Sequence, residues 1–293
     1  MPAILWSQRF VKAQRLIAEE EGLRGALATT SSNSSVVFSA LDILNADPKT
    51  KDPIKSTALQ GFQWLGDARI QKVVSDSTFD LAELSSGLCD LFVAVPPEYK
   101  HILAPWMRWL LGELFTSVRR NRPRERIVIF VDEAAALGRY TEILTAATEL
   151  PGYGASLWTF WQDRSQILEL YGEAGAATIL NTAEWVTVSD LGAIDPNESE
   201  RWSKALGDYT AIVKTTNRPA DGKGQTHISS VPQAAPLMAK EALVTMPPEK
   251  LLAFPNALGY ARHPLKLDKT MAFTNKRIKP LLNQVKPIGK ASK

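Results

Sequence analysis

The sequence has few of the side chains that build disulfides and metal sites. Its 293 residues include one cysteine, Cys89, and three histidines, His101, His227 and His263. A single cysteine excludes an internal disulfide, and the spacing of these four residues is not that of a zinc site. We therefore expect no structural metal.

A long uninterrupted apolar segment is lacking as well. The longest apolar stretch, residues 102–118, is broken by Pro105, Arg108 and Glu113, whereas a membrane helix needs about 18 or more apolar residues. Residues 1–15 scatter arginine and lysine among apolar positions and lack the pattern of a secretory signal. We expect a globular, cytosolic chain that does not cross a membrane by itself.

Acidic residues are scarce at the carboxyl end. Residues 261–293 contain nine Lys or Arg residues and one acidic residue, Asp268, and so carry a charge of +8. Since the whole chain carries +3, the remainder carries about −5. Such a tail suits contact with the phosphates of a nucleic acid or with an anionic membrane. A solvated and partly disordered terminus is the alternative.

An acidic pair follows the most informative apolar run. Residues 127–131 are apolar and rich in β-branched side chains, which predicts a strand buried on both faces, and Asp132 and Glu133 come directly after it. Gln162 ends a second apolar stretch thirty residues after Asp132. In nucleotide hydrolysis one carboxylate holds the shell of Mg²⁺ and a second can orient or deprotonate water. Asp132 suits the first role and Glu133 the second.

The glycine-rich partner of such a strand is missing. No G-x-x-x-x-G-K-[ST] pattern lies between Met1 and Lys293. The segments 222–224 and 289–290 combine glycine with lysine, but neither follows an apolar strand. The chain therefore looks like the downstream part of a nucleotide-binding domain.

The order of periodic segments predicts three parts. Residues 1–75 have helical spacing and predict an all-helical subdomain, and residues 241–293 form a basic extension with a short helix near Met246. Between them, residues 76–240 alternate strands and helices, which predicts an α/β fold with a mostly parallel, doubly wound sheet. The expected strands are residues 91–95, 127–131, 155–161, 184–189 and 209–215, and the expected helices are residues 101–118, 141–149, 167–180 and 198–206.

Several motifs together resemble the cytoplasmic part of type IV secretion coupling proteins, the TraG/TraD class of conjugation ATPases. They are residues 129–139, the Pro-Gly-Tyr-Gly turn at 151–154, and residues 161–167 with Tyr171 and Gly172. Residues 79–81 through 95–97 give weaker support. Each motif is modest evidence alone, but their order and spacing together are quite specific.

The resemblance implies a RecA-like nucleotide-binding domain with an all-helical domain inserted between its P-loop half and its Walker B half. This chain would be the carboxyl-terminal portion, with the P-loop and two membrane helices upstream. The complete protein would be a hexameric, ATP-driven motor at the cytoplasmic face of the bacterial inner membrane. It would pass single-stranded DNA bound to a relaxase, or protein substrates, to the type IV secretion channel, and its helical domain would recognise the relaxosome.

Residue by residue, the resemblance implies that Asp132 holds Mg²⁺ through water, Glu133 polarises the attacking water and Gln162 senses the γ-phosphate. Some relatives have an arginine where this chain has Pro151, so Arg139 or Arg164 is the candidate trans-acting cation. ATP and Mg²⁺ are the cofactors expected of the complete protein. Without phosphate-binding amides and a lysine, we expect this chain alone neither to bind ATP tightly nor to hydrolyse it.

Simpler interpretations compete with these roles. Asp132 and Glu133 would equally suit capping of the following helix, and Gln162 would suit satisfying backbone groups at a strand end. The aromatic residues Trp158, Phe160 and Trp161 are expected in the core rather than stacked on bases. The arginine-rich segment 119–124 is expected to be a solvated loop rather than a DNA-facing or subunit-facing patch.

Two other functions remain open from the sequence. One is a nucleotide-independent adaptor that docks relaxosome or substrate proteins through the helical region. The other is a DNA motor of the FtsK type, which shares the RecA-like core. That class predicts a winged-helix tail, for which residues 266–293 offer no helical pattern.

Overall fold

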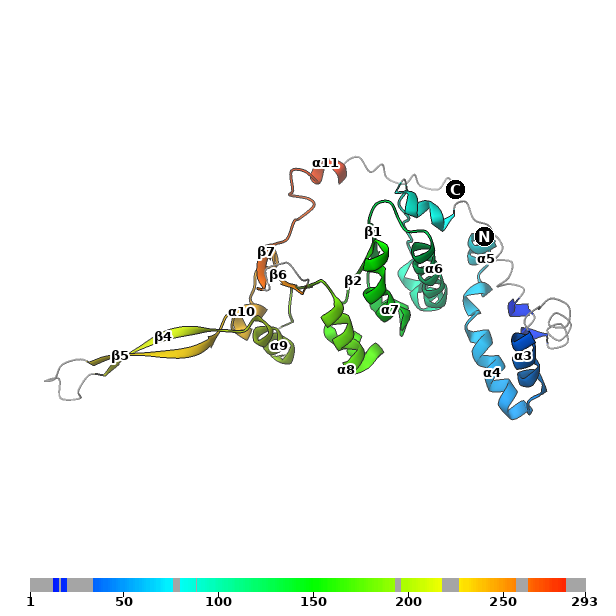
Figure 1. Ribbon diagram of the computed structural model, residues 1–293, viewed down its shortest axis with the longest axis horizontal. Coiled ribbons are helices and arrows are strands. Elements are labelled where there is room, and N and C mark those ends of the chain that lie inside the picture. Colours follow the sequence, from blue (N-terminus) through cyan, green and yellow to red (C-terminus); the bar gives the residue numbers. More distant parts are fainter. Residues whose placement is uncertain are drawn as a thin grey trace. The chain divides into compact units, whose positions relative to one another are not determined.

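The computed structural model describes residues 13–15, 17–19, 34–75, 80–87, 89–192, 196–217, 227–256 and 263–282. The chain divides into two compact units, Met1–Ile179 and Leu180–Lys293 (Figure 1). Two predictions fall partly outside the described residues: the helical region 1–75, of which most of residues 1–33 are not described, and the basic extension, of which residues 283–293 are not described. The predicted division at residues 75 and 240 stays a prediction.

The first unit begins with short helices. They are α3 (Ser34–Asn45), α4 (Pro48–Gln60), the 3-10 turn η1 (Gln63–Gly66) and α5 (Ala68–Ser75). No strand occurs in the described range 34–75, in agreement with the helical spacing. Two aspartate–proline pairs at residues 47–53 suggest a turn from the sequence, but α4 begins there instead. Its start is stable because Asp47 caps it by accepting the N–H of Lys49 at 2.8 Å.

The long helix α6 (Lys100–Arg120) joins the helical region to the sheet. Near its start, Leu103 packs against a buried cluster with Trp64 and Leu65. Near its end, Phe115 and Val118 enter a second core with the strands and the next helix. One helix therefore fixes the position of the helical segment 62–74 relative to the sheet within this unit.

The prediction of a strand at residues 91–95 is wrong. The segment from Asp90 to Pro96 has no regular secondary structure, and the side chain of Phe92 is 90% exposed. It lies between two 3-10 turns, η2 (Leu81–Ser86) and η3 (Pro97–Tyr99). An apolar run becomes a strand only when a neighbouring strand pairs with it, and the described residues supply none here.

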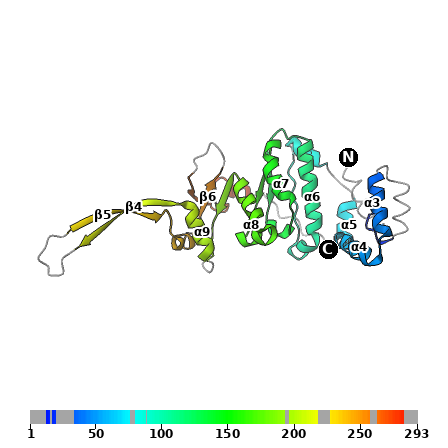
Figure 2. The same ribbon diagram turned by 60° about the horizontal axis from the view of Figure 1, so that its bottom comes forward.

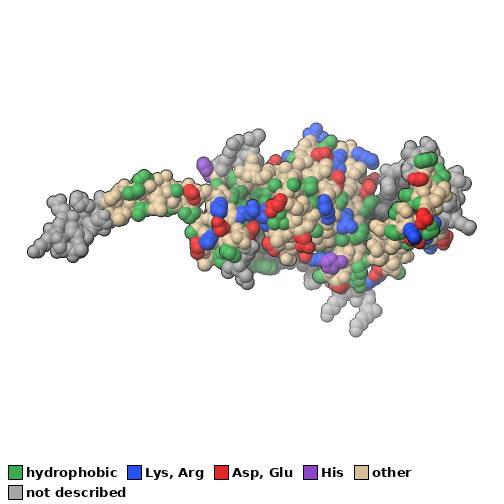
Figure 3. Space-filling model, turned by 90° about the horizontal axis from the view of Figure 1, so that it is seen from below, with side chains coloured by type: hydrophobic (Ala, Val, Ile, Leu, Met, Phe, Trp, Pro, Cys, Tyr) green, Lys and Arg blue, Asp and Glu red, His purple; other side chains and the backbone are tan. Residues whose placement is uncertain are grey.

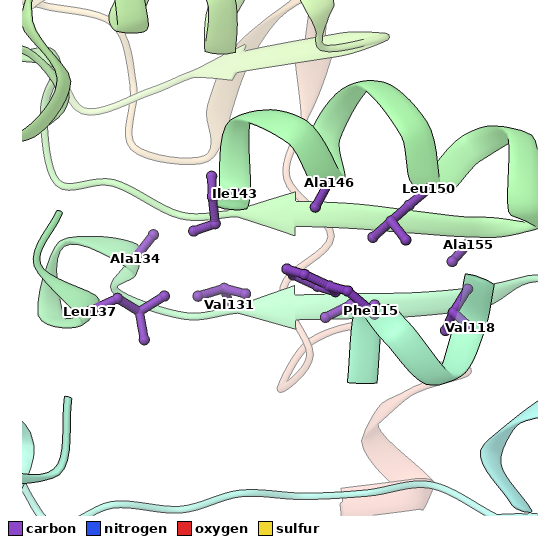
Figure 4. Packing of buried hydrophobic residues seen from close by; sticks show 10 residues of the cluster. Phe115, Val118, Val131, Ala134, Leu137, Ile143, Ala146, Leu150 and Ala155 are labelled. Carbon is purple, nitrogen blue, oxygen red and sulfur yellow. The ribbon is translucent and has the colours of Figure 1, made fainter. Parts of the chain in front are cut away.

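Two parallel strands form the sheet of the first unit. Strand β1 (Ile127–Val131) pairs with β2 (Ala155–Thr159), from Ile127 opposite Ala155 to Val131 opposite Thr159. Helices α6 and α7 (Glu142–Glu149) cover one face of this pair, and Figure 4 shows their side chains meeting the strands. The buried core consists of Phe115, Val118, Ile129, Val131, Ala134, Leu137, Ile143, Ala146, Leu150 and Ala155.

The opposite face of this sheet is exposed. Phe130 is 65% exposed, and Trp158 and Phe160 are each 44% exposed. The ring of Phe130 lies 6.0 Å from that of Trp158 and 6.3 Å from that of Phe160. The prediction that Trp158 and Phe160 lie in the core is wrong, because α6 and α7 cover the other face only; Trp161 is partly buried against the core.

Arginines of the segment 119–124 take part in the fold. Arg119 lies at the end of α6, with its side chain 24% exposed, and pairs with Glu142 at 2.9 Å and with Glu149 at 3.2 Å, both on α7. Arg122 donates to the carbonyl of Gly152 at 3.4 Å. The expected solvated loop is thus confined to the residues after α6, and Arg119 serves to hold the two helices together.

Helix α8 (Arg164–Thr182) follows β2 and contains the boundary between the two units. The sequence predicts it to be weakened at Gly172, and the backbone there leaves the helical conformation with φ 68° and ψ −179°. A positive φ is tolerated at glycine because it has no Cβ. The kink therefore falls where the sequence permits it.

The second unit has its own antiparallel sheet. Strand β6 (Lys250–Pro255) lies between β3 (Trp185–Val188) and β7 (Leu265–Asp268). Strand β3 was expected to extend the parallel sheet, and this is wrong, because β6 pairs with it in antiparallel orientation. The prediction of a helix that starts near Met246 is wrong too. The helix α10 (Lys240–Val244) ends before Met246, and the chain continues into β6, which buries Leu252 and Ala253.

The remaining elements of this unit include α9 (Pro196–Leu206) and the ribbon of β4 (Asp208–Asn217) and β5 (His227–Pro236) (Figure 2). The short helix α11 (Lys279–Leu282) follows β7 (Figure 1). Part of the basic extension is folded, because Lys269 forms an ion pair with Asp190. None of the helices in the described parts of the chain is long and apolar enough to cross a bilayer.

Replacement of Phe115 by alanine should destabilise the first unit by about 3–5 kcal/mol, because its ring is fully buried among both helices and the strands. The matched control is Phe92→Ala, which removes an equally large but 90% exposed ring and should change stability by less than about 0.5 kcal/mol. Urea unfolding followed by far-ultraviolet circular dichroism measures both. Equal effects of the two variants would contradict the described core.

Candidate functional site

The acidic pair and Gln162 lie at one edge of the parallel sheet. Strands β1 and β2 end together, at Val131 and Thr159, and Asp132 and Gln162 follow their ends. Two further hydrogen bonds join the chains beyond the strands. The N–H of Phe160 donates to the carbonyl of Val131 at 3.1 Å, and the N–H of Ala134 donates to that of Phe160 at 2.9 Å. The segments that follow β1 and β2 are therefore joined through their backbones.

The backbone turns sharply at Glu133. Its φ of 53° and ψ of 60° lie in the left-handed region. Among the described residues, Asp190 is the one other non-glycine residue with a positive φ. Such a conformation costs about 1–2 kcal/mol. It turns the chain from the end of β1 into the 3-10 turn η4 (Ala134–Leu137). Strain of this kind, held by surrounding structure, is common at functional sites.

The carboxylate of Glu133 forms an ion pair with the ammonium group of Lys100, the first residue of α6. Both side chains are about one-third exposed. Lys100 could not be identified from the sequence, because the two residues are far apart in the chain and no motif includes the lysine. In this arrangement one carboxylate oxygen of Glu133, Oε2, is bound to a cation and is not available to orient a water molecule.

Asp132 is exposed and has no hydrogen-bond partner within the described residues. Glu133 occupies the N-cap position of η4, yet its side chain makes no capping hydrogen bond. The next helix, α7, also begins without a side-chain cap. Neither of these helix starts therefore has a capping hydrogen bond from the acidic pair, and Asp132 is accessible to a cation.

Gln162 stands at the entrance to α8. Its N–H donates to the side-chain oxygen of Gln166 at 2.9 Å, and its own side chain is exposed. Asp163 begins the helix by accepting the N–H of Ser165 at 2.7 Å and that of Gln166 at 3.2 Å. The Ser165 hydroxyl, and then these backbone groups, hold the pKa of Asp163 below its ordinary value.

The two candidate cations differ in their surroundings. Arg139 is exposed, one residue after Gly138 in the loop that leaves η4. The side chain of Arg164 is 11% exposed and pairs with Glu173 on its own helix at 2.8 Å. Arg139 is consequently the more accessible of the two to another molecule.

Two tyrosines hold the loop of Arg139 against α8: Tyr171, which belongs to one of the family motifs, and Tyr140, which the sequence did not single out. The Tyr171 hydroxyl accepts the N–H of Tyr140 at 3.3 Å and donates to the carbonyl of Tyr140 at 3.2 Å. Burial raises the pKa of Tyr140 to about 12 and raises that of Tyr171. The ring of Trp161 meets that of Tyr171 edge-on at 6.2 Å, so the segments after β1 and after β2 are connected.

A shallow depression of about 470 Å³ opens along α6. Arg108, Trp109 and Glu113 of α6 line it together with Tyr140 and Glu142. None of Asp132, Glu133 or Gln162 lines this depression, and it is therefore separate from the acidic edge.

These observations define an α/β protein with a carboxylate-bearing edge of a parallel sheet. The family model for conjugative DNA transfer by the type IV secretory system matches residues 9–293. The chain belongs to this family, whose members are the type IV coupling proteins.

Curated relatives agree with this assignment. The chain is 27% identical over 190 residues to the conjugal transfer protein TraG of Rhizobium radiobacter, covering 64% of this chain and 29% of TraG. It is 26% identical over 229 residues to protein VirD4 of the same bacterium, covering 76% of this chain and 32% of VirD4. This chain thus spans about a third of the length of these relatives.

Solved structures confirm the fold. The chain superposes on the conjugative coupling protein TrwBΔN70 with a TM-score of 0.62 at 16% identity, covering 90% of this chain and 64% of that one. The complex of TrwB with ADP and Mg²⁺ matches with a TM-score of 0.59 at 16% identity, covering 84% and 56%. The predicted α/β fold of the RecA-like type is therefore confirmed, whereas the roles of individual site residues remain predictions.

Replacement of Asp163 by alanine should destabilise the fold by about 1 kcal/mol at neutral pH, because α8 loses its cap. The folded-state pKa of Asp163 is lowered, so its contribution is complete above the unfolded value near 3.8 and is lost as the pH falls through the folded value. Urea unfolding between pH 7 and pH 3 measures the free energy of unfolding of both proteins. The difference between the wild type and Asp163→Ala should become smaller below about pH 4.

The control is Glu169→Ala, an exposed carboxylate on the same helix, which should change stability little at any pH. If Asp163→Ala lowers the free energy of unfolding by the same amount at every pH, the capping role is contradicted.

Proposed function

We propose that this chain is the Walker B portion of a type IV coupling protein that acts in conjugative DNA transfer, and that its acidic edge contributes to an ATP site. The observation that carries the proposal is the parallel pairing of β1 with β2, which puts Asp132, Glu133 and Gln162 at one edge. In α/β sheets, ligands bind outside the carboxyl ends of the strands. TrwB has been solved with ADP and Mg²⁺, which supports a nucleotide site in the complete protein.

In the proposed site, Asp132 is the ligand that holds the water shell of Mg²⁺, because it is exposed and has no partner among the described residues. Glu133 orients the attacking water once it separates from Lys100. Gln162 responds to the γ-phosphate from the end of the neighbouring strand. The bound Mg²⁺ supplies charge neutralisation, whereas these residues supply position.

The phosphate cradle must come from outside the sequence described here, because this chain has no G-x-x-x-x-G-K-[ST] pattern. The exposed face of Val128, Phe130, Trp158 and Phe160 supports this view. Parallel strands are normally covered on both faces. We infer that the part of the nucleotide-binding domain that carries the P-loop packs on this open face or pairs at an edge of the sheet.

The remaining proposals concern location and partners. The complete protein would stand at the cytoplasmic face of the bacterial inner membrane, where its helical region, represented by α3 to α5, would contact relaxosome proteins. Single-stranded DNA and the secretion channel would be its other partners. The adaptor function is the second candidate, and the absence of a P-loop pattern from this sequence is the observation that favours it.

The purified chain alone should show no ATP hydrolysis above background, because phosphate-binding backbone amides and a P-loop lysine are not encoded in it. Joined to a P-loop-bearing portion, it should hydrolyse ATP, and Glu133→Gln should lower that rate by about 100-fold or more. Phosphate release measures both. Turnover by the isolated chain that disappears in Glu133→Gln would contradict the first expectation.

Plasmid transfer from a donor strain should fall by about 100-fold or more when Asp132→Asn or Glu133→Gln replaces the wild-type chain. The control variant is Glu169→Gln, which removes an exposed carboxylate away from the sheet edge and should transfer normally. A mating assay counts the recipients. Transfer that requires the chain but tolerates both acidic-edge variants would identify the adaptor function instead.

A further inference from the structure

The ribbon of β4 and β5 has almost no partner within its own unit. Its side chains are exposed along the described positions 208–215 and 229–236, except for the half-buried Ala211 and Ala235. Among the described residues, the ribbon is held mainly at its base, where β5 meets α9 and the Ser203 hydroxyl donates to the carbonyl of Met238 at 2.7 Å. An isolated two-stranded hairpin is marginally stable in water. The ribbon therefore needs a further contact.

One face of the ribbon is uncharged. On it lie Tyr209, Ala211, Val213 and Thr215 of β4 opposite Ala235, Gln233, Val231 and Ser229 of β5. Tyr209, Val213 and Val231 are large, apolar and exposed. Apolar and neutral polar atoms dominate the ribbon in Figure 3 as well. The two charged residues at the described positions, Asp208 and Lys214, both lie on β4 and on the other face.

The two edges of the ribbon differ in their capacity to pair. Pro236 and Pro232 of β5 lie opposite Asp208 and Ile212 of β4. Proline has no N–H, so these even-numbered positions belong to the pairs that do not exchange hydrogen bonds within the ribbon. Odd-numbered residues form the hydrogen-bonded pairs. Just beyond the strand end, Leu237 lies opposite Gly207, and its N–H donates to the carbonyl of Gly207 at 2.9 Å. Even-numbered residues of both strands therefore direct their backbone groups outward.

This alternation leaves one edge open. On β5 the outward positions include Pro232 and Pro236, which have no N–H to donate, and proline is a common means of blocking an edge strand. On β4 the outward positions 208, 210, 212 and 214 all retain their N–H groups. A further strand can therefore pair with β4 and not with β5.

We propose that the strand added to this edge is β4 of a second copy of the chain. Antiparallel pairing about a two-fold axis at Ala211 places Asp208 opposite Lys214 of the second copy, and Lys214 opposite its Asp208. It also places Tyr209 opposite the second copy's Val213, an aromatic and β-branched pair that stabilises sheets. Asp208 and Lys214 form no ion pair within the described chain, and both become paired in this register.

No other two-fold register of β4 on itself brings these opposite charges together, because only Ala211 lies midway between Asp208 and Lys214. The product is a four-stranded sheet in the order β5, β4, β4, β5. Its outer edges are the proline-bearing strands, which stops further growth. The uncharged face becomes continuous across both copies.

A disulfide tests the register directly. In a background of Cys89→Ser, which removes the one native cysteine, Ala211→Cys places two thiols opposite each other at a non-hydrogen-bonded pair. The Cα atoms of such pairs are about 4.5 Å apart, within the disulfide range of about 4.4–6.8 Å. Mild oxidation at micromolar concentration should give a disulfide-linked dimer, seen on a non-reducing gel. The matched control, Ala234→Cys on the proline-bearing strand, should stay monomeric.

Charge exchange tests the pairing independently. In the Ala211→Cys background, Lys214→Asp puts like charges opposite each other and should lower the dimer yield severalfold at low salt. The double change Asp208→Lys with Lys214→Asp should restore it. A monomeric Ala211→Cys chain, a yield no higher than that of Ala234→Cys, or a double variant that fails to recover would each overturn the proposal. The assay uses neither nucleotide nor DNA, so its outcome is independent of the proposed function.

Discussion

Parallel pairing of β1 with β2 is the interaction on which the candidate site depends. Parallel strands place their carboxyl ends at the same edge, so the residues that follow Val131 and Thr159 must meet. Phe115 and Val118 of α6 pack beneath this pair and fix it to the helical segment. A change that shifts the register of the two strands would move Asp132 away from Gln162, even though both side chains stayed the same.

The sheet is covered on one face only, and this constrains its chemistry. A parallel sheet with Phe130, Trp158 and Phe160 exposed keeps a large apolar surface in contact with water, which is unfavourable and typical of an interaction surface. The same part of the fold lacks a phosphate-binding loop in its sequence. Both features support the proposal that this chain would supply one part of a nucleotide site.

The ion pair between Lys100 and Glu133 connects the acidic edge to the start of α6. Two opposite charges near a protein surface attract each other by a few kcal/mol at most, and solvent screens part of this. A bound nucleotide with its Mg²⁺ changes the local charge by a comparable or larger amount. If the acidic edge binds a nucleotide as proposed, a pair of this strength is weak enough to open.

The sequence by itself determined the parts of this protein whose signals are local. The apolar run 127–131 followed by Asp132 and Glu133, the glycine turn before β2 and the weakening at Gly172 each depend on adjacent residues, and each was found where it was predicted. The α/β class and the family followed from the order of these motifs. Helix starts were predicted to within a few residues, because capping and periodicity are short-range effects.

Only the tertiary structure decided which strands pair and which faces are covered. Residues 91–95 have the composition of a strand but no partner, and β3 joins β6 and β7 because antiparallel partners from residues 250–268 reach it. The aromatic residues of β2 are exposed because the helices available lie on the opposite face. Lys100 meets Glu133 only through the packing of α6. Pairing and burial depend on contacts between residues far apart in the chain, and a local pattern does not specify them.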